Sequence, residues 1–150
     1  MTHLKTGDSA PSINSVDENG DVITLEQFKG KKVVLYFYPK DMTPGCTVQS
    51  CNLRDNYQSL LENGYVVLGC SADSPARHIK FIEKHDLPFP LLSDESKSVI
   101  NAYGVWGPKK FMGREYDGIH RTTFVIDENG IIEDIIEKVD TKEHITQILK

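Results

Sequence analysis

Long apolar runs and basic clusters are absent from this 150-residue sequence, and each absence excludes a class of protein. Without an apolar run of about 20 residues, the chain is not expected to span a membrane. Its 17 basic and 22 acidic residues give a formal net charge of −5, so we do not expect nucleic acid as a partner. The opening, MTHLKTGDSAPS, lacks the apolar stretch of a signal peptide, and we therefore expect a cytoplasmic location.

Cysteine is scarce as well, with three residues at positions 46, 51 and 70. This odd, small number excludes a disulfide scaffold, and a close pair in the reducing cytoplasm indicates catalysis, redox chemistry or metal binding. The CxxxxC spacing is poor for zinc, whose ligands are usually separated by about two to four residues, and His78 and His85 do not lie at i, i+4. No Gly-rich phosphate loop or haem attachment motif is present, so we expect neither a metal nor another cofactor.

The order of apolar and polar segments predicts one α/β domain over residues 1–150. Neither an internal repeat nor a linker divides the chain. Short apolar runs rich in β-branched and aromatic residues indicate buried strands, and they alternate with segments of helical periodicity. We expect a central mixed β-sheet with helices on both faces and an N-terminal β-hairpin. The expected elements are a hairpin over 13–25, a strand over 31–39, a helix over 46–63, a strand over 65–73, a helix over 74–87, a strand over 88–94, a helix over 94–105, a loop over 105–120, two strands within 121–139 and a helix over 141–150.

The stretch YFYPKDMTPGCTVQSC, residues 36–51, places Cys46 where a strand gives way to a helix. First-turn amide N–H groups lack intrahelical partners and the helix dipole is positive there, so both favour thiolate, the nucleophilic form of cysteine. The alternative is a small buried apolar residue, which is the usual role of a free cysteine. The flanking Thr-Pro-Gly turn favours the reactive interpretation.

Cys51 follows five residues later on the same expected helix. This spacing puts it on another face and too far from Cys46 for a disulfide. Either Cys51 is an ordinary helix residue, or the first turn must unwind to join the two sulfurs. Cys70 lies inside the apolar strand VVLGCSAD and is expected to be a packed core residue.

The motif Pro39-x-x-x-Thr43-x-x-Cys46 resembles the active-site motif of peroxiredoxins, which are thiol peroxidases on a thioredoxin-like fold. The longer string FYPKDMTPGCT, with the second cysteine at Cys51, is similar to the bacterioferritin-comigratory-protein or peroxiredoxin Q subfamily. RTTFVID matches the segment in which the family carries its active-site arginine, here Arg121, and YGVWG and GDSAPSI also fit. Gln49 departs from the resemblance, because many members are expected to have glutamate there.

The resemblance implies a role for each of these residues. Cys46 would attack a hydroperoxide and become a sulfenic acid. Arg121 would supply a fixed positive charge and Thr43 a hydroxyl hydrogen bond. The N–H groups of Gly45 and Cys46 would polarise the peroxide, and Pro39 would shield the pocket from water. The aromatic loop around Trp106 indicates an apolar edge to the substrate pocket.

Each of these roles has a structural alternative. Thr43 could cap the helix, and Pro39 could simply end the strand. Arg121 could be an ordinary surface residue, and Trp106 could pack within its loop.

The resemblance also implies how the cycle is completed. Cys51 would resolve the sulfenic acid as an intramolecular Cys46–Cys51 disulfide after local unwinding, and thioredoxin or a similar dithiol would reduce it. An intramolecular partner permits a monomer, which we expect, with a weak homodimer as the alternative. Three alternatives remain open, one of which is a structural domain with incidental cysteines. A thiol–disulfide oxidoreductase would carry CxxC, which this chain lacks, and a redox sensor would be oxidised once without turnover.

Overall fold

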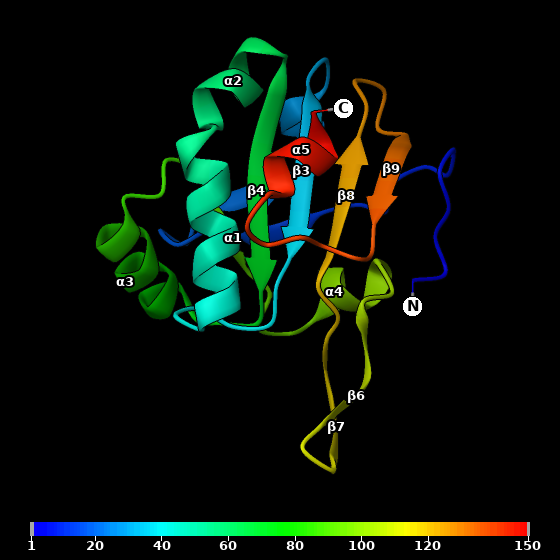
Figure 1. Ribbon diagram of the computed structural model, residues 1–150. Helices are drawn as coiled ribbons and strands as arrows, with labels where there is room; N and C mark the ends of the chain where they lie inside the picture. Colours follow the sequence, from blue (N-terminus) through cyan, green and yellow to red (C-terminus); the bar gives the residue numbers. More distant parts are fainter. Residues whose placement is uncertain (1, 150) are drawn as a thin grey trace.

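The computed structural model describes residues 2–149, and seven strands of this range form one sheet (Figure 1). These strands are β1 (Asn14–Val16), β2 (Val22–Thr24), β3 (Lys32–Phe37), β4 (Tyr65–Ser71), β5 (Leu91–Ser93), β8 (Thr122–Ile126) and β9 (Ile132–Ile136). Their order is β2-β1-β5-β4-β3-β8-β9. β3, β4 and β5 are parallel, whereas β1, β2, β8 and β9 pair antiparallel with their neighbours, so the sheet is mixed, as the sequence predicts.

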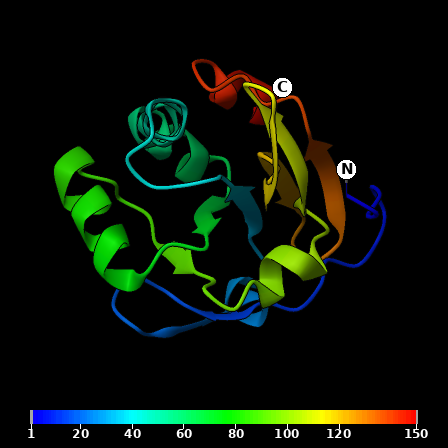
Figure 2. The same cartoon turned by 90° about the horizontal axis from the view of Figure 1, so that it is seen from below.

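Helices cover both faces of this sheet. They are α1 (Pro44–Asp55), α2 (Tyr57–Glu62), α3 (Pro75–His85), α4 (Ser98–Ala102), α5 (His144–Ile148) and the 3-10 helix η1 (Leu25–Phe28). Seen from below, α1 and α5 lie on one side of the sheet and α4 lies on the other (Figure 2). The alternation of side chains along β3 explains why both faces are apolar. Leu35 and Phe37 pack with Ile100 of α4, whereas Val34 and Tyr36 face the opposite cluster.

The predicted helix over 46–63 is two helices in the structure. α1 begins at Pro44, two residues before the expected start, because proline is favoured in the first turn of a helix. The chain then breaks at Asn56, whose φ and ψ are −114° and 14°. Its side-chain amide donates to the Asn52 carbonyl over 2.8 Å, and this local side-chain bond competes with the regular helix.

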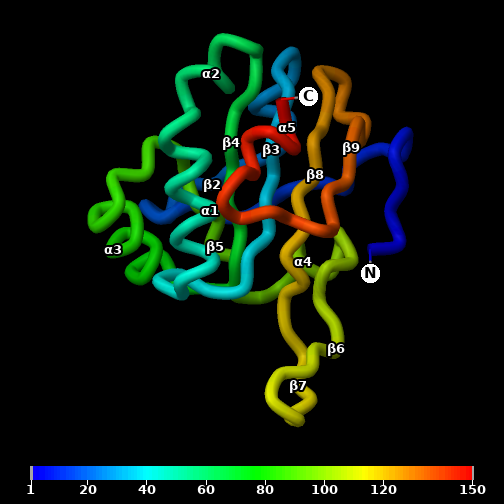
Figure 3. Tube along the Cα trace, viewed as in Figure 1, coloured from blue at the N-terminus to red at the C-terminus, as the bar shows by residue number. Residues whose placement is uncertain are grey.

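The predicted loop over 105–120 is wrong: most of it forms a hairpin of β6 (Trp106–Phe111) and β7 (Arg114–Ile119). The two strands meet at Met112–Gly113, where both residues have positive φ, as a tight hairpin turn requires. Without an Asn-Gly or Asp-Gly pair, the sequence gives no clear signal for this turn. The hairpin projects well beyond the rest of the molecule (Figure 3).

Other elements are shorter than expected. The helix predicted over 94–105 covers Ser98–Ala102, and the strand predicted over 88–94 covers Leu91–Ser93. The final helix covers His144–Ile148 of the expected 141–150, whose last residue lies outside the described range. Within the described residues, no helix is both long and apolar enough to cross a membrane.

The His144 side chain of α5 is fully buried and contacts Thr123 of β8 in the sheet. Its Nδ1 lies 2.7 Å from Oε1 of Gln147, to which it donates. Its Nε2 lies 2.8 Å from the hydroxyl of Thr123 and accepts from it. Burial lowers the pKa of His144 and so favours the neutral ring, in which Nδ1 donates to Gln147 and Nε2 accepts from Thr123.

This arrangement predicts a pH-dependent stability. Burial, aided by the nearby charge of Arg121, lowers the pKa of His144 from its usual value of about 6.5. The unfolded chain then binds more protons than the folded chain near that value, so the free energy of unfolding falls as pH decreases through about 6.5. In urea titrations between about pH 7.5 and pH 5.5, His144→Gln should lose less stability than the unchanged protein. The exposed His3→Gln should keep the full pH dependence, and an equal slope in all three proteins would contradict the prediction.

Candidate active site

Cys46 lies in the first turn of α1, directly after the loop that leaves β3. Thr43 precedes the helix with extended backbone angles, and Pro44 occupies the first helical position. The Cys46 side chain is almost completely buried, with 1% of its surface exposed. The sequence therefore correctly predicts its place at a helix start, but the thiol is covered.

Arg121 covers this thiol. Its Nη2 donates to Sγ of Cys46 over 3.3 Å, and its Nη1 donates to Oε1 of Gln49 over 2.6 Å. Arg121 comes just before β8, and β8 pairs with β3 so that Thr122 lies opposite Phe37. Because β8 runs antiparallel to β3, Arg121 lies at the same end of these two strands as the loop that leads into α1. A fixed guanidinium charge therefore lies within hydrogen-bonding distance of the Cys46 sulfur.

Gly45 makes the approach of Arg121 possible. A Cβ atom at this position would lie 3.2 Å from Nη2 of Arg121, closer than most such contacts. A side chain at residue 45 would therefore press on the guanidinium. The small size of Gly45 therefore matters for the position of Arg121, in addition to the N–H role that the resemblance implies.

Gln49 is fully buried one helical turn after Cys46. It keeps the acceptor that Arg121 needs, although it carries no charge. Its Nε2 has no hydrogen-bond partner within the described part of the chain. An unpaired buried amide costs about 1–3 kcal/mol, so this contact holds α1 less firmly than a fully paired one would.

Thr43 does not make the predicted contact with Cys46 among the hydrogen bonds of residues 2–149. Its hydroxyl donates to the Lys40 carbonyl over 2.9 Å, and its side chain makes no capping bond to the helix. The capping alternative is therefore also wrong for this conformation. The hydroxyl must rotate away from Lys40 before it can donate to a substrate.

Pro39 and Trp106 line the same cleft of about 380 Å³, together with Lys109 and Tyr116. Trp106 belongs to β6 and not to a loop, and the Nζ of Lys97 lies 5.1 Å from its ring centroid. Arg121 lines a neighbouring cleft of about 410 Å³. Cys46 lines neither cleft, and Arg121 connects the second one to the buried thiol through its 3.3 Å contact with Sγ.

Both Cys51 and Cys70 are free thiols, as is Cys46. Cys51 is half-buried on α1, which is intact between the two cysteines. Cys70 is fully buried in β4, and burial raises the pKa of its thiol well above the usual value. Cys70 is therefore the packed strand cysteine that the sequence predicts.

Asp41 lies between Pro39 and Thr43 of the Cys46 motif, and the sequence indicates no role for it. Its carboxylate accepts from the Tyr38 hydroxyl and lies 2.6 Å from Nδ1 of His78, whose Nε2 is 2.9 Å from the Leu92 carbonyl. Its backbone N–H donates to Asp73. These buried bonds fix the loop that leads into α1.

The side chains of Asp41, Asp73 and His78 are close enough to share a metal ion. However, Arg77 and the Ser71 hydroxyl already donate to Asp73 over 2.9 and 2.7 Å. With Tyr38 also donating to Asp41, the ligand atoms have protein partners, and this cluster is a structural network.

The family model described as the AhpC/TSA family matches residues 6–135. Peroxiredoxin Bcp of Escherichia coli strain K12 is 49% identical over 149 residues, which cover 99% of this chain and 96% of that protein. This chain belongs to the AhpC/TSA family of peroxiredoxins.

Further relatives agree with this membership. Peroxiredoxin Bcp of Bacillus subtilis strain 168 is 44% identical and is matched over 98% of this chain and 94% of its own length. The structure of the Xanthomonas campestris bacterioferritin comigratory protein, described by its alkyl peroxide reduction activity, superposes with a TM-score of 0.86 at 29% identity, covering 99% of this chain and 95% of that one. The predicted thioredoxin-like fold is thereby confirmed.

Membership establishes the general chemistry. The peroxiredoxin is a thiol-dependent peroxidase that takes a hydroperoxide substrate and a thiol reductant. Sequence reasoning found Cys46 and Arg121 through the family motif. The sequence shows Gln49 only as a departure from the resemblance, and its contact with Arg121 becomes visible in the fold.

The contact with Arg121 predicts that Cys46 reacts more slowly when this arginine is replaced. Replacing Arg121 with Gln removes a charged hydrogen bond worth about 1.5–3 kcal/mol, so the reaction of Cys46 with hydrogen peroxide should slow by about 10- to 100-fold. The rate can be followed by stopped-flow fluorescence of Trp106, the only tryptophan. Arg114→Gln, at the exposed hairpin, is the matched control and should leave the rate unchanged. A rate for Arg121→Gln equal to that of the control would contradict the role of this contact.

Proposed function

We propose that Cys46 is the peroxidatic thiol of this peroxiredoxin. The observation that carries this proposal is the 3.3 Å contact between Nη2 of Arg121 and Sγ of Cys46 in the first turn of α1. The thiolate attacks one oxygen of the hydroperoxide and becomes a sulfenic acid, while the O–O bond breaks and the other oxygen leaves as alkoxide or hydroxide. Arg121 stabilises negative charge on the sulfur and on the reacting oxygens.

The surrounding groups orient the peroxide. The N–H groups of Gly45 and Cys46 have no intrahelical carbonyl partner at this helix start, and they donate to the peroxide oxygens. The Thr43 hydroxyl joins them after rotating away from Lys40. Pro39 limits the access of water to the sulfenic acid, and its position in the cleft with Trp106 supports this role.

We assign Cys51 as the resolving cysteine. Its thiol attacks the sulfenic sulfur of Cys46, which releases water and forms the Cys46–Cys51 disulfide. Because α1 is intact between the two residues, the helix must first unwind there. This breaks the contact of Gln49 with Arg121 and the 3.0 Å hydrogen bond between the Ser50 and Tyr36 hydroxyls.

Asn52 sets the limit of this unwinding. Its Nδ2 donates to the Lys142 carbonyl and its Oδ1 accepts from the Ile145 N–H, both over 2.9 Å. These two bonds hold Asn52 on the chain around α5. The unwound segment therefore covers residues 44–51, and the rest of α1 stays on the sheet.

The proposed disulfide needs a reducing partner that can exchange thiols with it. We propose a cytoplasmic dithiol protein of the thioredoxin type, which reduces Cys46–Cys51 by thiol–disulfide exchange. Hydrogen peroxide and organic hydroperoxides are the proposed substrates, in line with the alkyl peroxide activity named for the Xanthomonas campestris relative. Because both cysteines belong to one chain, we propose that residues 1–150 act as one domain and as a monomer.

Peptide mapping tests this assignment. The reduced protein is treated with one equivalent of hydrogen peroxide, quenched rapidly and analysed by mass spectrometry. We expect a Cys46–Cys51 disulfide with Cys70 still a free thiol. In Cys51→Ser, Cys46 should accumulate as sulfenic acid and be oxidised further. Three free thiols in the treated protein would contradict the proposal, and repeated turnover with thioredoxin and its reductase would exclude a sensor that is oxidised only once.

A further inference from the structure

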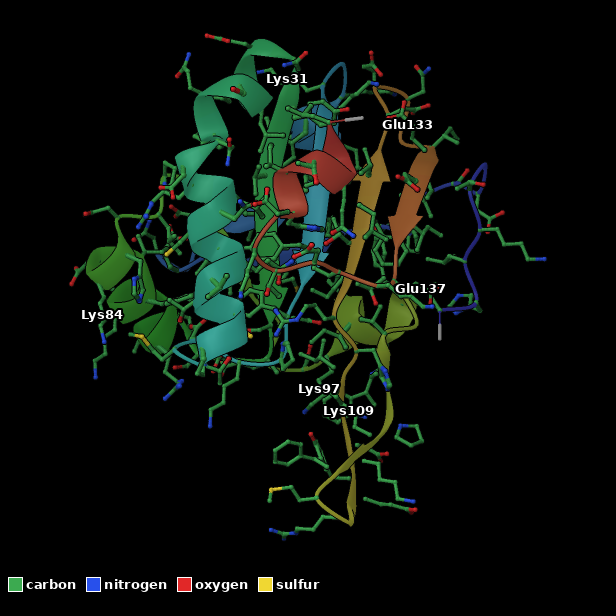
Figure 4. The ribbon with its side chains drawn as sticks, in the orientation of Figure 1. Lys31, Lys84, Lys97, Lys109, Glu133 and Glu137 are labelled. Carbon is green, nitrogen blue, oxygen red and sulfur yellow. The ribbon has the colours of Figure 1, made fainter. Side chains whose placement is uncertain are left out.

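Lys109 connects the two clefts beside the active site. It lines the cleft of about 410 Å³ together with Arg121, and it also lines the cleft of about 380 Å³ together with Pro39 and Trp106. Figure 4 shows Lys109 near the point where the projecting hairpin joins the body of the molecule. The resemblance to the family assigned no role to this residue.

The fold holds the Lys109 side chain in a defined position. Its stem passes over Gly118 of the paired strand, where a Cβ atom would lie 3.0 Å from Cδ of Lys109. Its Nζ donates to the Ile119 carbonyl over 2.8 Å. Since an ammonium has three N–H donors, one such bond leaves donors for a group in the cleft.

Its neighbour Lys110 is placed differently. Alternation along β6 puts the two side chains on opposite faces of the hairpin. The Lys110 side chain is 73% exposed and lies 4.0 Å from Glu115. Two adjacent lysines thus have distinct environments, which makes Lys110 a matched control for Lys109.

Burial favours loss of the Lys109 proton. Burial lowers the pKa of its ammonium, and the positive charge of Arg121 lowers it further, whereas the negative charge of the Cys46 thiolate acts in the opposite direction. The geometry agrees with these effects, because Lys109 shares a cleft with Arg121, which contacts the Cys46 sulfur. The remaining ionisable side chains that line the two clefts are His120, Glu137 and Lys138 in one, and Lys40, Asp73, Lys97, Tyr116 and Asp117 in the other.

Peroxide reduction needs a proton for the oxygen that leaves when the O–O bond breaks. When the thiolate attacks a hydroperoxide, the attacked oxygen keeps its hydrogen and the other oxygen leaves as a strongly basic alkoxide or hydroxide. Arg121 can stabilise that charge but does not give up a proton, because a guanidinium stays charged in proteins. A lysine with a lowered pKa can do so.

We propose that Lys109 is the general acid that protonates the leaving oxygen; this rests on the proposed role of Cys46 as nucleophile. The sulfur of Cys46 loses two electrons and gains the OH group, and the O–O bond takes up those electrons as it breaks. A proton passes from Nζ of Lys109 to the alkoxide and gives an alcohol. Water in the open cleft then returns a proton to the lysine.

Leaving-group dependence tests this proposal. The rate of Cys46 oxidation is measured with tert-butyl hydroperoxide, which releases a basic alkoxide, and with peroxyacetic acid, which releases an acetate that needs no proton. Lys109→Met should slow the first reaction by about 100-fold or more, within the usual range for general acids, and leave the second nearly unchanged. Lys110→Met should react like the unchanged protein with both substrates.

Lys109→Arg separates proton transfer from charge, because arginine keeps the charge and cannot donate the proton. We expect it to remain slow with tert-butyl hydroperoxide. Rescue by arginine, an equal loss with both oxidants, or no loss in Lys109→Met would each overturn the proposal. If the unchanged protein failed to react with either oxidant, the proposed role of Cys46 would be wrong instead, so the two failures are distinguishable.

Discussion

The contact between the Arg121 guanidinium and the Cys46 sulfur is the interaction on which the active site depends. It joins the segment before β8 to the first turn of α1, two parts of the chain that are 75 residues apart. The antiparallel pairing of β8 with β3 makes this possible, because it puts Arg121 and the loop to α1 at the same end of the two strands. Gly45 leaves room for the guanidinium, and Gln49 supplies the second acceptor. Charge, steric space and strand order therefore act together on one thiol.

α1 has to satisfy two opposing requirements. It must present Cys46 in a regular first turn, and that same turn must unwind if Cys51 is to reach it. Unwinding would break the side-chain contacts of Gln49, which accepts from Arg121 but keeps an unpaired buried amide, and of Ser50, whose hydroxyl contacts that of Tyr36. Directly afterwards, Asn52 is held by two hydrogen bonds to the chain around α5, so stability rises abruptly along one helix.

Several of these features were predictable from the sequence, and the reasons differ between them. The continuous apolar run before Pro39 indicates a strand that is buried on both faces, and the motif around Cys46 is specific enough to identify the family. The β6–β7 hairpin was missed because its turn uses Met112–Gly113, a pair without the usual turn signature. The break at Asn56 depends on one side-chain hydrogen bond, and the place of Lys109 depends on a cross-strand glycine. Such contacts between distant residues leave no local pattern.

Hydrogen–deuterium exchange across α1, in the reduced protein and after peroxide treatment, tests the central claim most directly. The account predicts protected amides in the first turns of the reduced protein, since Arg121 and Gln49 hold them in place. After oxidation, the amides of residues 47–55 should exchange freely, because their helical carbonyl partners lie in or beside the unwound segment, whereas the amides from Asn56 onward should stay protected. Equal protection of residues 47–51 in both states would contradict the account, because an intact helix cannot join Cys46 to Cys51.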